Sequence, residues 1–171
     1  NGKVLNDDGI DVCRSEGVTI RNSFIRTQDD CIAPKWWCRN LLVEDCALWT
    51  DWANAVRIGW ECDPGGGVFE NLTFRNIEVA HLSMEKRPAS HEWFNSCFCV
   101  QASNGQLIRG VRFENVNVQT VEPGDVLFVA YSGSCGSYLG GGSIDGVTLR
   151  NVSTAEGAKM TTRLAAEKPG Q

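Results

Sequence analysis

The sequence is poor in several features that mark common protein classes. Its 171 residues contain no run of 18 apolar residues, so no segment is expected to cross a membrane as a helix. Lys and Arg number 16 against 21 Asp and Glu, and this net charge of −5 argues against a nucleic-acid partner. Only 5 prolines are present and the pattern for helices is weak, whereas 18 glycines favour a fold with many tight turns.

The N-terminal residues lack the marks of a secretory signal. The stretch NGKVLNDDGIDV has no initiator Met, no basic start and no apolar core. We therefore expect the chain to be a piece of a longer one.

Zinc-binding spacings are also missing, although cysteine is abundant. Eight cysteines occur, but none form a C-x-x-C pair, and only 2 histidines are present, so no structural zinc site is expected. Two interpretations stay open for the cysteines. Disulfides would indicate an oxidising compartment, whereas free cysteines would serve as small buried apolar residues.

One five-residue pattern recurs along the chain. Each copy has an aliphatic residue, any residue, an apolar residue, any residue, and then Asn or Asp, and each follows a Gly or Asn. The copies are VTIRN (18–22), LLVED (41–45), LTFRN (72–76), VRFEN (111–115) and VTLRN (147–151). This alternation is typical of a half-buried strand, and its recurrence every 20–40 residues or so favours a parallel β-solenoid. An antiparallel sandwich is the alternative, but no two-residue Asn-Gly or Asp-Gly turn joins neighbouring copies.

The repeat predicts an all-β fold of about five to six stacked coils. We expect the solenoid to cover residues 1–158 and a C-terminal cap or tail to cover 159–171, where KMTTRLAAEK (159–168) has the composition of a short helix. Side chains at equivalent positions should stack in columns. The last residue of each copy is expected to form a ladder at one corner: Asn22, Asp45, Asn76, Asn115 and Asn151.

Two acidic segments lie about one coil apart. Pairing Ile10 with Ile32, an offset of 22 residues, places NDDGID (6–11) beside QDDCI (28–32) on the next coil, so that four or five carboxylates share one patch. Crowded carboxylates raise one another's pKa, so that one tends to stay protonated at neutral pH. Glycoside hydrolysis needs such a neutral acid beside an ionised base, about 6.5–9.5 Å apart in the inverting route. The alternative is that these aspartates only form turns.

At these residues the sequence resembles the polygalacturonases of glycoside hydrolase family 28. NDDGID (6–11) is similar to that family's N-T-D-G-I-D, and TQDDCIA (27–33) to its Gly- or Gln-Asp-Asp motif one coil later. The resemblance implies a right-handed, single-stranded parallel β-helix, here a fragment of a longer one, and inverting hydrolysis of α-linked galacturonan. It implies that Asp29 is the general acid and that Asp8 and Asp30 position and activate the water. We expect no metal or cofactor to take part.

The sequence departs from that family at two further motifs. Aligning Ile58 and Gly59 with the family's Ile-Gly puts Asn54 where its G-H-G motif has histidine, so Asn54 is a candidate substrate-binding residue. The Arg-x-Lys of the following coil is missing, because the strand there reads CFCVQ (97–101). A neutral α-glucan is therefore an alternative substrate, as for the related dextranases and isopullulanases of glycoside hydrolase family 49.

Tryptophan is concentrated just after the second acidic segment. Five of the six tryptophans lie between positions 36 and 60. Indole rings stack on the C–H faces of sugars, so Trp36, Trp37 and Trp60 are candidate substrate-binding residues. Packing in the core is the alternative for each ring.

Lys35 and Arg57 are candidate substrate-binding residues in the same region. Each could hydrogen-bond to a sugar hydroxyl or acid group, or could instead pair with Asp29 or Asp30 and hold it ionised. Alternation beside the inward-facing Ile58 places Arg57 on the side of the carboxylates.

Two other function classes stay open. In a calcium-dependent polysaccharide lyase the carboxylates would bind Ca²⁺, and Lys35 or Arg57 would abstract a proton. The chain could also be a non-catalytic carbohydrate-binding or truncated module. Each of these readings implies a polysaccharide or oligosaccharide partner, and we expect a secreted or periplasmic location. Because the carboxylates lie on the first coil, we also expect self-association through an exposed β-helix edge.

Overall fold

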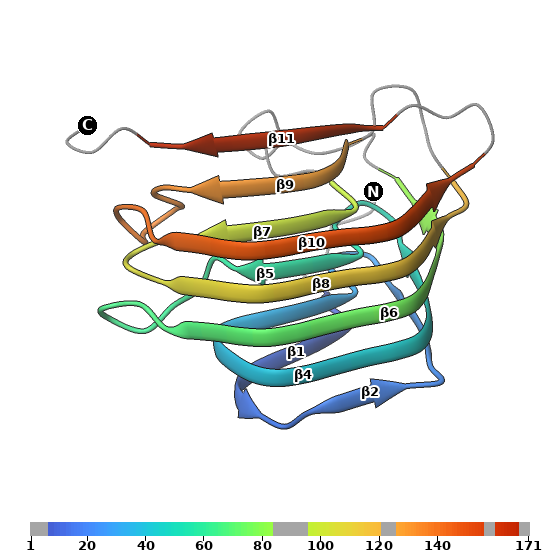
Figure 1. The fold of residues 1–171 in the computed structure, drawn as a ribbon, viewed down its shortest axis with the longest axis horizontal. Helices are drawn as coiled ribbons and strands as arrows, with labels where there is room; N and C mark the ends of the chain where they lie inside the picture. Colours follow the sequence, from blue (N-terminus) through green and yellow to red (C-terminus); the bar gives the residue numbers. More distant parts are fainter. Residues whose placement is uncertain (1–6, 84–95, 121–125, 156–159, 168–171) are drawn as a thin grey trace.

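A computed structural model shows eleven strands stacked as successive coils, with no helix in residues 7–83, 96–120, 126–155 and 160–167, which the structure describes (Figure 1). None of these residues belongs to a helix with the length and apolar character needed to cross a membrane. The strands are β1 (Ile10–Glu16), β2 (Thr19–Arg21), β3 (Phe24–Thr27), β4 (Ile32–Thr50), β5 (Val56–Gly59), β6 (Val68–Leu82), β7 (Phe98–Ala102), β8 (Leu107–Val118), β9 (Val126–Ser132), β10 (Ser143–Thr154) and β11 (Thr161–Ala166).

All strand pairs between these elements are parallel. The order β10-β8-β6-β4-β5-β7-β9-β11 runs through one sheet that curls round the core, and β1, β2 and β3 also pair with β4. Equivalent residues of successive coils lie one above the other. One column consists of Ile10, Ile32, Val56, Phe98, Phe128 and Thr162. The predicted all-β parallel β-helix is thus confirmed, with six levels in this column.

The inward positions of the repeat form the core. Val43, Phe74 and Phe113 stack in register on β4, β6 and β8 and are fully buried. The ring centroids of Phe74 and Phe113 are 5.0 Å apart, and Phe98 on β7 stacks on Phe113 at 4.3 Å. Burial of such rings is strongly favourable. The alternation of apolar and polar residues in the repeat therefore makes each coil close around the core.

A ladder of side chains marks one corner of the helix, as predicted. Its five members have φ between 52° and 53°, the left-handed region that Asn and Asp tolerate best after Gly. The Nδ2 group of Asn76 donates to Asp45 Oδ1 at 3.0 Å, Asn115 donates to Asn76 at 3.0 Å, and Asn151 donates to Asn115 at 2.8 Å. Each amide therefore joins its coil to the coil before it.

The prediction of a short helix within residues 159–168 is wrong. Thr161–Ala166 forms strand β11, which pairs in parallel with β9 through contacts such as Leu164 with Ala130. Ala and Leu favour helices locally, but an open strand edge offers backbone partners to a whole segment and overrides that preference. The division of the chain at residues 158 and 159 stays a prediction.

All eight cysteines are free thiols, which supports the second interpretation of them. Seven are buried and Cys13 is half-buried. Burial raises the pKa of the Cys31 thiol to about 12 and that of the Cys38 thiol to about 11. These cysteines therefore behave as small apolar residues of the core.

Candidate active site

Asp8, Asp29 and Asp30 come together at the turns that precede β1 and β4, and we call them the acid cluster. Each offers a carboxylate oxygen within 4.8 Å of the others. The Gly9 amide donates to the Asp30 carbonyl at 2.9 Å, which locks the two turns together. A Cβ atom on Gly9 would lie only 2.5 Å from the Cys31 carbonyl oxygen, so this close approach requires glycine. The predicted offset of 22 residues is the one that brings the three together.

Backbone amides hold the carboxylates of the acid cluster. The Asp30 amide lies 3.2 Å from Asp8 Oδ1 and 3.0 Å from Asp29 Oδ1, and the Asn54 amide donates to Asp30 Oδ1 at 2.8 Å. Asp29 and Asp30 are only 8% and 4% exposed. Asp7, expected in the same patch, is exposed, and its backbone carbonyl accepts from the Asp29 amide.

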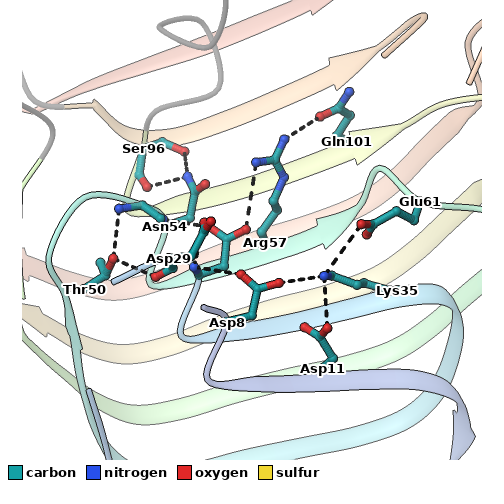
Figure 2. Close-up of polar contacts among 12 residues, drawn as sticks. Asp8, Asp11, Asp29, Lys35, Thr50, Asn54, Arg57, Glu61, Ser96 and Gln101 are labelled. Carbon is teal, nitrogen blue, oxygen red and sulfur yellow. Dashed lines mark hydrogen bonds and ion pairs between the residues drawn. The ribbon is translucent and has the colours of Figure 1, made fainter. Parts of the chain in front are cut away.

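Lys35 lies at one side of the acid cluster, among three carboxylates (Figure 2). Its Nζ atom is 2.6 Å from Asp8 Oδ2, 3.0 Å from Asp11 Oδ2 and 3.7 Å from Glu61 Oε1. Burial by itself lowers the pKa of the Lys35 ammonium, but the hydrogen bonds to Asp8 and Asp11 outweigh burial and raise it. The sequence suggested Asp29 or Asp30 as partners of Lys35. In the structure Lys35 pairs instead with Asp8, Asp11 and Glu61.

The sequence analysis did not identify Asp11 and Glu61 as partners of Lys35. Burial raises the pKa of the Glu61 carboxyl against the opposing effect of the nearby cations Lys35 and Arg57. Burial also raises the pKa of Asp11, although the hydrogen bond from Lys35 opposes it. The signal for Asp11 lay in the first acidic segment itself, whereas Glu61 follows β5 and carries no motif.

Arg57 on β5 faces the acid cluster, as alternation predicted. Its Nη1 atom is 3.9 Å from Asp30 Oδ2, and Nη2 donates to Gln101 Oε1 at 3.4 Å (Figure 2). Its guanidinium lies 3.5 Å from the centroid of the Trp60 ring, a cation–π contact. Gln101 is a further residue that sequence reasoning missed, and a lone amide in the apolar strand FCVQA was its only signal.

Asn54 extends the acid cluster toward the next coil. It is fully buried, and its Nδ2 group donates to the Ser96 carbonyl at 2.7 Å and lies 3.2 Å from Ser96 Oγ. Its backbone amide holds Asp30, so Asn54 joins the acid cluster to the start of β7. A direct contact of Asn54 with substrate stays a prediction.

Trp36, Trp37 and Trp60 are all half-buried, and Trp60 lies against Arg57. The Arg14 guanidinium lies 4.7 Å from the Trp36 ring centroid, so both Trp36 and Trp60 carry an arginine on one face. Both tryptophans also have positive φ, 62° and 73°, which is uncommon for a bulky residue. Their role in binding sugar stays a prediction.

The spacing within the acid cluster is also compatible with a bound cation. A hard cation such as Ca²⁺ takes six to eight oxygen ligands. Here the Lys35 ammonium already lies 2.6 Å from Asp8, where such a cation would compete with it. We therefore assign no metal to these residues, and the absence of a cofactor stays a prediction.

A family model described as "Glycosyl hydrolases family 28" matches residues 1–156. The chain belongs to this family. An Aspergillus niger protein, by name a galacturan 1,4-alpha-galacturonidase, is 29% identical over 139 residues, which cover 80% of this chain and 32% of the relative. The exopolygalacturonase of Cochliobolus carbonum is 25% identical over 168 residues, 93% of this chain and 37% of the relative. No solved structure gives a significant match.

This family 28 chain spans about a third of the length of the curated relatives it matches. Both acidic segments that carry the resemblance, 6–11 and 27–33, lie inside the matched range. The expected secreted or periplasmic location stays a prediction.

Proposed function

We propose that this family 28 chain carries the catalytic centre of a glycoside hydrolase that cleaves pectin-like, α-linked galacturonan with inversion. The observation that supports this most is the acid cluster itself, three carboxylates within 4.8 Å on adjacent coils. The curated relatives, named a galacturonidase and an exopolygalacturonase, support the pectin-like substrate.

In the proposed reaction Asp29 is the general acid and gives its proton to the glycosidic oxygen as that bond breaks. Asp8 and Asp30 orient a water molecule and take its proton as it attacks the anomeric carbon. Asp8 suits this role because the Lys35 ammonium, 2.6 Å away, and the Asp30 amide hold its carboxylate in place. Asp30 accepts a hydrogen bond from the Asn54 amide, which fixes its orientation.

The spacing of the carboxylates makes stereochemistry the sharpest test of this mechanism. Oxygens within 4.8 Å are closer than the 6.5–9.5 Å or so usual for inverting enzymes, and nearer the value of about 5–5.5 Å for retaining ones. Inversion therefore rests on the family resemblance. NMR of the first product from an α-linked substrate should show the β-anomer, and the α-anomer appearing first would contradict inversion.

Arg57 is the proposed partner of the substrate's acid group. It is buried beside Asp30 and Trp60, where a uronate carboxylate bound next to the scissile bond would meet its guanidinium. Asn54, Trp36 and Trp37 stay candidate contacts around the same sugar. Lys35, also a substrate-binding candidate from the sequence, is instead surrounded by Asp8, Asp11 and Glu61. A neutral α-glucan has no acid group to offer this guanidinium, so a preference for dextran or pullulan would contradict the assignment.

A reducing-sugar assay tests the activity. We expect release from polygalacturonate, and a fall of about 10²–10⁴-fold in Asp29→Asn because the general acid is lost. Asp145→Asn is the matched control, since Asp145 is exposed on β10, away from the acid cluster. Unsaturated, ultraviolet-absorbing products that require calcium would instead indicate a lyase, and no release from any polymer would indicate a non-catalytic module.

A further inference from the structure

Lys35 is a largely enclosed cation beside the acid cluster. Its side chain is 11% exposed, and carboxylates approach it from three directions: Asp8 before β1, Asp11 on β1 and Glu61 after β5 (Figure 2). We propose that Lys35 is a positioning residue, which holds the Asp8 carboxylate turned toward the attacking water. This inference rests on the proposed function, since it gives Asp8 the task of activating that water.

The two oxygens of Asp8 are held by different partners. Oδ2 accepts from Lys35 Nζ at 2.6 Å, and Oδ1 accepts from the Asp30 amide at 3.2 Å. Because these partners lie on opposite sides of the carboxylate, rotation of the group would break both bonds. The Asp30 amide is part of the backbone, so Lys35 is the side chain that fixes the plane of the Asp8 carboxylate.

Lys35 is held in turn by the two outer carboxylates. An ammonium has three N–H donors, and here three carboxylates lie within 3.7 Å of it, two of them at hydrogen-bonding distance. The donors of Lys35 are therefore directed at the protein, and a substrate group would have to displace one of these carboxylates. This is the arrangement expected of a group that orients another residue.

The charges facing this position explain why a cation is needed there. Asp11 and Glu61 form ion pairs with Lys35, and Cys13 is its register partner on β1. Asp29 and Asp30, the other members of the acid cluster, lie on the far side of Asp8. Without the ammonium, the neighbouring carboxylates would repel the Asp8 carboxylate and turn it out of its position. A displaced Asp8 carboxylate could not accept a proton from the attacking water.

Steady-state kinetics of Lys35→Met test the proposal. We expect kcat to fall by about 10²-fold with KM within about twofold, because a misplaced catalytic group slows the chemical step. A raised KM with unchanged kcat would overturn the proposal in favour of a substrate contact. Arg75→Met is the matched control, because Arg75 pairs with Glu44 at 2.6 Å on the exposed face of β6.

A second measurement keeps the proposal separate from the proposed function. A crystal structure of Lys35→Met shows the Asp8 carboxylate even if no polymer is cleaved. We expect this carboxylate to turn away from the Asp30 amide, and an Asp8 side chain in its wild-type position would overturn the proposal. Lys35→Arg keeps the charge in case Lys35→Met fails to fold. It should lower kcat because the larger guanidinium displaces the Asp8 carboxylate, and wild-type kcat in Lys35→Arg would overturn the orienting role.

Discussion

Glu61 shows at the scale of one residue how burial and charge compete beside the acid cluster. Burial raises the pKa of its carboxyl, and the cations Lys35 and Arg57 only partly offset this. Between the ordinary value of 4.5 and the raised value, the folded chain binds more protons at this site than the unfolded chain. Stability contributed by this group is therefore lost as pH rises through that window.

We expect Glu61→Gln to unfold at a higher temperature than wild type near pH 7 or so, because the neutral amide avoids the cost of a buried charge. The difference should shrink as pH falls toward 4.5, where the wild-type carboxyl becomes protonated. Thermal unfolding followed by circular dichroism at both pH values measures it. A variant that is less stable at neutral pH would show that the attraction to Lys35 outweighs burial.

Glu167→Gln provides a control of opposite sign. Hydrogen bonds from the Ser134 backbone and the Tyr131 hydroxyl lower the pKa of Glu167, so its carboxylate form is favoured in the fold. Its contribution is present above 4.5 and is lost as pH falls through the lowered value. This variant should therefore be less stable than wild type at neutral pH and should approach it in acid.

The residues of the acid cluster could be predicted from the sequence, but their partners could not. The offset between Ile10 and Ile32 fixes which turns meet, because the period of a parallel coil determines the register. Alternation also gives the face of Arg57. It does not give the reach of a long side chain, and Lys35 extends to Asp8 and Asp11 on the coil before its own and to Glu61 on the coil after.

At the scale of the coil, corners are set by residues that accept a left-handed backbone. Asn115 has φ 53°, accepts from Asn151 and donates to Asn76. Its amide thus serves both the conformation of the corner and the contact between coils. The repeat revealed this corner because the conformation limits the residue types that can occupy it.

We expect Asn115→Ala to be less stable than Asn115→Gly by about 1–2 kcal/mol, because both lose the ladder bonds but only alanine is strained at positive φ. Urea unfolding gives the two free energies. Asn117 is the matched control, since it donates to Glu78 at 3.1 Å and is not among the residues with positive φ. There alanine should be at least as stable as glycine, and the same order at both positions would contradict the explanation.

The corner beside the acid cluster follows a different rule. Arg14, Trp36 and Trp60 occupy left-handed positions there, with φ 47°, 62° and 73°. Long side chains in this conformation cost free energy that Asn or Gly would avoid. The sequence could not predict this corner, because its residue types conflict with the conformation they adopt. Such conflicts concentrate at functional sites, and this one adjoins the proposed active site.

At the scale of the whole molecule, parallel strands pair from coil to coil along the helix axis, and in the described part of the chain the strands of the terminal coils have a partner on one side only. Strands β1, β2 and β3 pair with β4, and no second partner is recorded for them within the residues described. Strand β11 shows the strength of this pairing, because a segment with helical propensity became a strand beside β9. A parallel edge of this kind favours pairing with another chain.

We expect the isolated chain to self-associate through the edge formed by β1, β2 and β3. Sedimentation velocity over a range of concentrations should show a species larger than the monomer whose share grows with concentration. Thr19→Pro should reduce that share, because proline on an edge strand removes an N–H donor from the pairing surface. Asn117→Lys, on the outer face of β8, which pairs with a strand on both sides, is the control for a general effect of substitution on a strand surface. A wild-type chain that stays monomeric at every concentration would contradict the prediction.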